Sequence, residues 1–279
     1  MQRWRPILPW LVAVILTAAL LVYQRRTGPT YPISVSTMVG GERVGGRLIR
    51  SQETTAPARV ELAAGPSLRG TLVWRRYPTD EPWQSVEMRR ENDRLVAELP
   101  KFQRAAKLEY QVRLEAPNGS REILPTEGTA ILRYKDPVPT WLLMIHILAI
   151  FLGPVFAFRA AVGCVLKEPN AWRWAPWVVA FLTLGGFVLG PMMQKYAFDA
   201  WWTGWPVGED LTDTKTLVAW LFWVAALWLS KARPKLAALS FWVALAVMVA
   251  VFLIPHSVRG SQVDWSKVPE TNPPGRASL

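Results

Sequence analysis

The sequence predicts an α+β membrane protein with an N-terminal anchor helix, a β-sandwich and a four-helix transmembrane module. Apolar runs near the length that crosses a bilayer, about 20 residues, occur in both the first and the last part of the 279-residue chain. Residues 30–136, between the first two runs, change to short alternating segments punctuated by Gly, Pro and Asn, which are typical of β-strands. The 51% of hydrophobic residues is therefore unevenly distributed, and this excludes a single soluble domain.

Five apolar segments predict the spans. They are residues 7–23, 141–158, 174–193, 217–229 and 236–254. The first follows Arg3 and Arg5 and is not followed by a small-residue cleavage pattern, so we interpret it as an uncleaved anchor. The second continues past Arg159 to about Leu166. The fourth has only 13 residues, and a helix that begins near Asp210 would lengthen it by nearly two turns.

Basic residues near the ends of the spans predict the orientation, because Lys and Arg are retained on the cytoplasmic side. The N-terminus and the loops after the second and fourth spans together carry eight basic residues and one acidic residue. The loop of residues 194–216 carries four acidic and two basic residues. We therefore expect a cytoplasmic N-terminus and an extracytoplasmic C-terminus, although Arg25 and Arg26 depart from the rule.

Alternation with period two predicts the strands of the β domain. The clearest are residues 69–77, 84–90, 94–100 and 107–115. In the last of these, one buried face should hold Leu108, Tyr110, Val112 and Leu114. Asn118-Gly119 accepts positive φ and predicts a hairpin, with return strands at 122–124 and 130–134. About seven short strands in a segment of this length suit a sandwich.

Composition divides the chain into four parts. Residues 1–29 form the anchor, 30–136 the extracytoplasmic β-sandwich, 137–258 the four-helix transmembrane module and 259–279 a polar C-terminal tail. From Asp264 onward the tail is rich in Pro and polar residues, so we expect it to be disordered unless a partner orders it. The net charge of +11 requires no nucleic acid, because in the membrane half the basic excess lies on the loops assigned to the cytoplasm.

Two resemblances add to this interpretation. The stretches Gly70-Thr-Leu-Val-Trp74, Trp83-Gln-Ser-Val-Glu-Met88, Ala97-Glu-Leu-Pro100 and Leu108-Glu-Tyr-Gln-Val112 resemble the immunoglobulin-like or fibronectin-type modules of bacterial envelope proteins. This covers about a third of the chain and implies an immunoglobulin-like fold without an activity. The second half, at Gly190-Pro-Met-Met-Gln-Lys-Tyr196, residues 202–216 and Ile254-Pro-His-Ser257, is similar to uncharacterised bacterial multi-span membrane proteins. Together the resemblances imply an inner-membrane protein, with no established function to carry over.

His146 and His256 are the only histidines, and both are predicted at the outer ends of spans. Ionisable groups in apolar segments usually face a bundle interior or a cavity. Two imidazoles from two helices could ligate haem b axially, or bind Cu or Zn with an added carboxylate. Their depths differ, since His146 lies about 7 Å below Trp141, whereas His256 follows Pro255 at the end of its run. The structural alternative is that His146 hydrogen-bonds a neighbouring helix and His256 is an interfacial polar residue.

The outer loop offers a second candidate site. Its acidic residues and one from the tail would form a rim over the histidines, made of Asp199, Glu209, Asp210, Asp213 and Asp264. Such a rim could bind a cation, accept protons from a quinol or dock a basic partner. The alternative is that Asp210 and Asp213 cap the fourth span and complement its helix dipole, while the tryptophans of the loop (Trp201, Trp202 and Trp205) form an aromatic belt.

Motifs for several chemistries are missing from the sequence. It contains no phosphate loop, no Gly-x-Ser-x-Gly elbow and no Cys-x-x-Cys, and its single cysteine, Cys164, excludes a disulfide framework. Two function classes stay open. In the first, His146 and His256 hold haem b or a transition metal for electron transfer, and the β domain docks a membrane or periplasmic protein partner. In the second, the protein is a non-catalytic accessory or assembly subunit of a larger envelope membrane complex.

Overall fold

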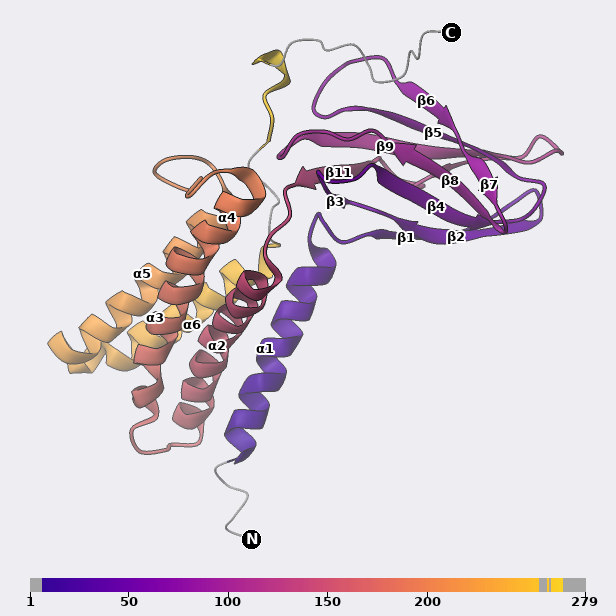
Figure 1. The fold of residues 1–279 in the computed structure, drawn as a ribbon. Helices are drawn as coiled ribbons and strands as arrows, with labels where there is room; N and C mark the ends of the chain where they lie inside the picture. The colour runs from indigo at the N-terminus through magenta and orange to yellow at the C-terminus, as the bar shows by residue number, and fades with distance from the viewer. Residues whose placement is uncertain (1–6, 256–259, 261, 268–279) are drawn as a thin grey trace. The chain divides into compact units, whose positions relative to one another are not determined.

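The computed structural model describes residues 7–255, 260 and 262–267, and the chain divides into two compact units (Figure 1). The helical unit comprises Met1–Gly28 and Val138–Gly260, and the β unit comprises Pro29–Pro137 and Ser261–Leu279. An N-terminal helix, a two-sheet β region and further apolar helices follow one another along the chain, which confirms the predicted order of elements.

Five segments among the described residues are long and apolar enough to cross a membrane. They are Ile7–Thr27, Thr140–Val165, Ala171–Phe198, Leu211–Ala232 and Pro234–Leu253. The helical elements are α1 (Ile7–Thr27), α2 (Thr140–Val165), η1 (Ala171–Trp174), α3 (Ala175–Leu182), η2 (Thr183–Leu189), α4 (Gly190–Phe198), α5 (Leu211–Ala232), η3 (Pro234–Leu236) and α6 (Ala237–Leu253). The fourth span begins directly after Asp210, as predicted, and this gives the short apolar run the length of a bilayer.

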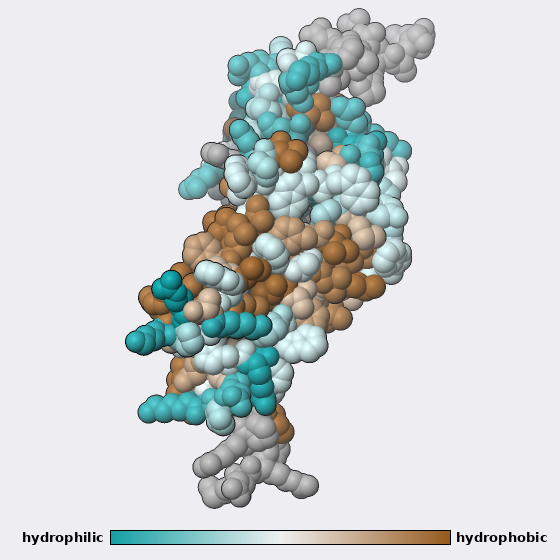
Figure 2. All heavy atoms as spheres, turned by 90° about the vertical axis from the view of Figure 1, so that its left-hand side faces the viewer, coloured by the Kyte–Doolittle hydropathy of each residue, from teal (hydrophilic) through white to brown (hydrophobic). Residues whose placement is uncertain are grey.

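Small and aromatic side chains pack the spans together. Trp223 of α5 and Phe241 of α6 are fully buried, and their rings meet edge to face with centroids 5.4 Å apart. Ala157 of α2 and Ala219 of α5 are also buried, which lets the helix backbones approach closely. Figure 2 shows a band of hydrophobic surface over these helices, with hydrophilic side chains gathered below it. Such an apolar outer surface is compatible with contact to a lipid bilayer.

The β unit contains two sheets. One has the strand order β1-β2-β4-β8-β7, and the other has β3-β11-β9-β5-β6 with β10 paired to β9. The strands are β1 (Ile33–Val39), β2 (Glu42–Leu48), β3 (Ser51–Glu53), β4 (Ala58–Ala64), β5 (Arg69–Arg76), β6 (Gln84–Glu87), β7 (Arg89–Glu91), β8 (Arg94–Leu99), β9 (Lys107–Glu115), β10 (Arg121–Leu124) and β11 (Ala130–Lys135). The prediction of about seven strands was too low, because β1 to β4 were not among the segments predicted and the predicted strand 84–90 divides into β6 and β7. The predicted hairpin at Asn118-Gly119 is confirmed between β9 and β10.

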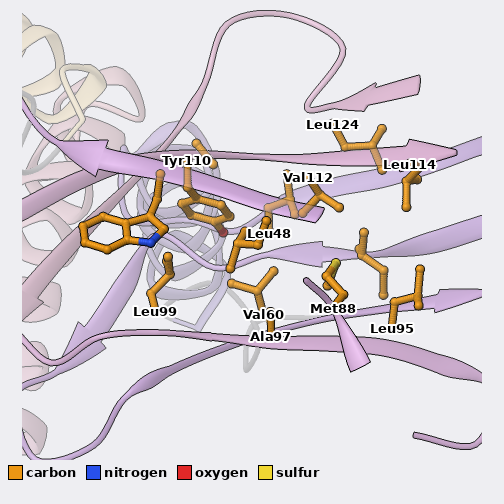
Figure 3. Close-up of a cluster of buried hydrophobic side chains, with 14 of the residues drawn as sticks. Leu48, Val60, Met88, Leu95, Ala97, Leu99, Tyr110, Val112, Leu114 and Leu124 are labelled. Carbon is orange, nitrogen blue, oxygen red and sulfur yellow. The ribbon is translucent and has the colours of Figure 1, made fainter. Parts of the chain in front are cut away.

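The two sheets share one hydrophobic core, in which side chains from both meet (Figure 3). As predicted, one buried face of β9 holds Leu108, Tyr110, Val112 and Leu114. The Tyr110 hydroxyl donates a hydrogen bond to the Ile49 carbonyl at 2.7 Å, so the polar end of this core residue is satisfied. Burial raises the pKa of Tyr110 well above its ordinary value.

The chain returns to the β unit after α6. Trp265, in the short 3-10 turn η4 (Trp265–Lys267), packs edge to face on Phe102, and its indole Nε1–H donates to the Tyr77 carbonyl at 2.9 Å. The Val263 N–H donates to the Ala105 carbonyl at 3.2 Å. The expectation of disorder from Asp264 onward is therefore wrong for residues 264–267, because one large aromatic side chain finds both a ring and a hydrogen-bond acceptor. Residues 268–279 lie outside the described part.

Candidate functional site

His146 lies in the second turn of α2, where its imidazole is half-buried beside η2. The ring donates a hydrogen bond to the Gly185 backbone, and a Cβ built on Gly190 would lie 3.9 Å from His146 Cε1. The Nδ1 atom is buried and has no hydrogen-bond partner among the described residues. His146 therefore faces other helices of the unit, and one of its two ring nitrogens is committed to the neighbouring span.

The element that His146 contacts, η2, is a seven-residue π-helix within the third span. Short π-helical insertions are rare and often occur at functional sites. The local cause is Pro191, which has no N–H and would clash with the carbonyl four residues earlier in a regular α-helix. Glycines then permit close packing, since a Cβ would lie 2.7 Å from Ile150 Cδ1 at Gly185 and 2.4 Å from Thr216 Cγ2 at Gly186. The sequence thus brings α2 and α5 against the π-helix.

This arrangement leaves one chemical option open at His146. A neutral imidazole that donates one N–H to a carbonyl presents the lone pair of its other nitrogen, as metal-ligating histidines usually do. The predicted partner, His256, lies outside the described residues. Within the described ranges, no three His, Cys, Asp or Glu side chains gather in a group that could hold a metal ion. The ligand hypothesis therefore depends, in the described part, on His146 alone.

Asp213 organises the loop between α4 and α5. Its carboxylate accepts hydrogen bonds from the Thr203 N–H at 2.9 Å, the Gly204 N–H at 3.1 Å and the Gln194 amide at 2.8 Å. A Cβ on Gly204 would lie 2.4 Å from Asp213 Cβ, so the loop requires glycine there. Asp213 is buried, and these donors satisfy a carboxylate that burial would otherwise leave unpaired.

The other predicted rim residues have separate environments. Asp210 is buried and accepts a hydrogen bond from the Thr212 N–H at 2.7 Å, which confirms its predicted capping of α5. Asp199 pairs with Lys195 at 2.6 Å, and Glu209 is exposed. Asp264 belongs to the β unit, where it accepts hydrogen bonds from Ser266. Since Asp210 and Asp213 bond inward, the acidic surface of this loop is narrower than predicted and consists of Asp199 and Glu209.

Two buried polar residues that the sequence patterns do not indicate cap the C-terminal end of α6. Gln24 of α1 donates its amide to the Phe252 carbonyl at 2.9 Å, and Lys215 of α5 donates its ammonium to the Ile254 carbonyl. Donors at a helix C-terminus satisfy carbonyls that lack intrahelical partners, and a cation there complements the helix dipole. For Lys215, the signal in the sequence is a lysine two residues before an apolar run, within the helix predicted to begin near Asp210.

Arg159, which lies within the predicted extension of the second span, is buried inside α2. Its guanidinium pairs with Glu168 at 2.7 Å and lies 5.5 Å from the ring centroid of Trp10 and 5.6 Å from that of Trp174. The ion pair and the aromatic faces stabilise a charge that burial would otherwise make costly. A charged residue inside an apolar run was the signal that could have identified it.

Comparison of the chain with protein-family models and with curated proteins found no match.

Proposed function

We propose that this protein is a non-catalytic accessory or assembly subunit of a bacterial inner-membrane complex, in which an immunoglobulin-like β domain docks a protein partner close to the membrane. One observation carries the proposal: the chain passes between the helical unit and the β unit three times. Residues 28–32 alone separate α1 from β1, and residues 136–139 separate β11 from α2. Linkers of this length reach less than about 20 Å, so they confine the β domain to the neighbourhood of the bilayer.

The same connections support a topology. Residues 262–267 pack on the β unit, so the segment after α6 lies on the same side of the membrane as the β domain. An even number of spans must then separate residues 137 and 260, in agreement with the four candidate spans there. The basic loops assign the N-terminus to the cytoplasm and the β domain to the extracytoplasmic side. Trp201 and Trp205 are exposed in the loop that this topology places at the outer surface.

The docking surface we expect is the edge strand β6. It is the terminal strand of its sheet, and all four of its residues are exposed, including Val86. The outer edge of a terminal strand carries backbone N–H and C=O groups that a partner strand can pair with.

Site-specific photo-crosslinking in the full chain tests this proposal. A photoreactive residue at Val86 should give one adduct of defined mass in living cells. A matched position at Thr55, which is exposed in the turn after β3 at the opposite end of the same sheet, should give none. Identical patterns at both positions, or no adduct at either, would contradict a docking role for β6.

His146 favours a second candidate function, a ligand to haem b or to a transition metal in electron transfer. The supporting observation is the pairing of one ring nitrogen with Gly185 while Nδ1 is buried and unpaired among the described residues. The purified full chain should then show a Soret band that shifts with dithionite, or one bound metal per chain. His146→Ala should abolish the signal, and His256→Ala tests the predicted pair. A colourless, metal-free protein would rule this candidate out.

A further inference from the structure

A cavity of about 370 Å³ lies at the C-terminal end of α5, between η1, α3, α5 and α6. Residues of the sites described above do not line it. The lining residues that matter for its chemistry are Trp172, Arg173, Trp223, Ala226, Lys231 and Phe241.

The walls of the cavity are aromatic and mutually supported. The Phe241 ring is fully buried and meets Trp172 edge to face with centroids 4.6 Å apart. Phe241 contacts Trp223 in the same way at 5.4 Å. Edge-to-face contacts of this kind hold rings in defined orientations, so the cavity is preformed and apolar, as small-molecule sites usually are.

Its polar lining consists of two cations, Arg173 and Lys231, which are exposed at the rim, and two neutral side chains, Asn170 and Ser230. Among the described residues, no acidic side chain lines the cavity. Trp223 is fully buried, and its Nε1–H has no hydrogen-bond partner among the described residues. The Trp223 indole therefore supports the wall from inside and is not a surface that a ligand can reach. The cavity offers a ligand two cations, two neutral polar side chains and an apolar wall.

We propose that this cavity binds an anionic phospholipid. The phosphate lies between Arg173 and Lys231, where a guanidinium can make two parallel hydrogen bonds to its oxygens. An acyl chain lies against the accessible apolar residues of the lining, Trp172, Pro176 and Leu227. Basic pockets between membrane helices recognise anionic head groups in this manner. The two cations and the apolar lining both lie at the end of a span, where the head groups of a bilayer would be. This site is independent of partner docking at β6 and of any ligand at His146.

Native mass spectrometry of the full chain in detergent tests the proposal with two lipids that share their acyl chains. Phosphatidylglycerol should bind at least tenfold more tightly than phosphatidylcholine. The double variant Arg173→Gln, Lys231→Gln should lose this preference. The matched double variant Arg233→Gln, Lys235→Gln removes the same charges from the neighbouring α5–α6 loop, outside the cavity lining, and should keep it.

Two further measurements test separately whether binding depends on the apolar lining and whether it depends on the phosphate group alone. Ala226→Phe fills the cavity with both cations intact and should lower phosphatidylglycerol binding at least tenfold, with circular dichroism and thermal unfolding checking that the variant is folded. Millimolar inorganic phosphate should fail to displace the lipid. Equal affinity for both lipids, equal losses in the two double variants, unchanged binding in folded Ala226→Phe, or displacement by phosphate would each overturn the assignment.

Discussion

The β unit and the helical unit distribute apolar and charged side chains in opposite ways. Among the described residues of the β unit, the large apolar side chains are inside except for Met38, Val86 and Ile123, which are exposed. In the helical unit Trp228 and Met144 are 65% and 60% exposed, and many other large apolar side chains share this exposure. The difference shows that the two units suit different solvents, since an apolar outer surface is stable in lipid and costly in water.

Both units also bury polar and ionisable side chains. In the β unit these include the Tyr134 hydroxyl, which donates to the Pro100 carbonyl at 2.6 Å, and the ionisable Glu109 and Arg133, of which Glu109 pairs with Arg75. In the helical unit the buried groups include ionisable ones, Arg159, Asp213 and Lys215, each held by a hydrogen bond or an ion pair. A bundle surrounded by lipid has no water to satisfy such groups, so each must find its partners within the protein.

The largest effect we expect is from Asp213→Ala. The substitution leaves three donors around a buried position without their acceptor, and we expect a loss of about 3–5 kcal/mol in the stability of the helical unit. Asp213→Asn, which keeps an acceptor oxygen, should lose less. Thermal unfolding in detergent measures the change. The control is Glu209→Ala, an exposed position in the same loop, whose stability should stay within about 0.5 kcal/mol of that of the unsubstituted protein. A melting curve for Asp213→Ala that matches this control would show that the loop does not depend on the carboxylate.

A pair of leucines tests the contrast of solvents directly. Leu108→Ala removes a fully buried side chain from the β core and should cost about 2–5 kcal/mol. Leu148→Ala removes a 56% exposed side chain from α2 and should cost about 0.5 kcal/mol or less in nanodiscs, because lipid fills the space. Hydrogen exchange reports each unit separately. Similar losses at both positions would mean that this face of α2 packs against protein.

The smallest expected effect concerns pH. Burial raises the pKa of Tyr110 in the folded β unit, so the unfolded chain releases that proton at a lower pH than the folded one. The resulting stability is complete below the ordinary tyrosine pKa of about 10 and is lost as the pH rises above it. Tyr110→Phe should therefore cost about 1 kcal/mol at pH 7, through the bond to Ile49, and should flatten the decline between pH 9 and 11. If the free energy of unfolding measured by hydrogen exchange falls equally steeply between pH 9 and 11 in Tyr110→Phe and in the unsubstituted protein, the result would contradict this assignment.

Local patterns predicted part of the site correctly. Asp210 before an apolar run indicated an N-cap, and α5 begins there as expected, because capping depends on residues only a few positions apart. The burial of Lys215 and Arg159 was not predicted, since each is stabilised by a residue from a distant part of the chain or by the rings of other spans. Such partners cannot be read from spacing. Trp265 was missed for the same reason, as its acceptor and ring lie more than a hundred residues earlier.

The sequence by itself determined the number of spans, the place of the β domain between the first two and the buried face of β9, because these follow from the length and period of apolar runs. Tertiary structure alone decided which polar residues turn inward, how the π-helix meets His146, and that Trp172, Trp223 and Phe241 enclose a cavity beneath two cations. These features depend on contacts between helices, where a few ångströms of approach, set by residues such as Gly185, select the neighbours that each side chain meets.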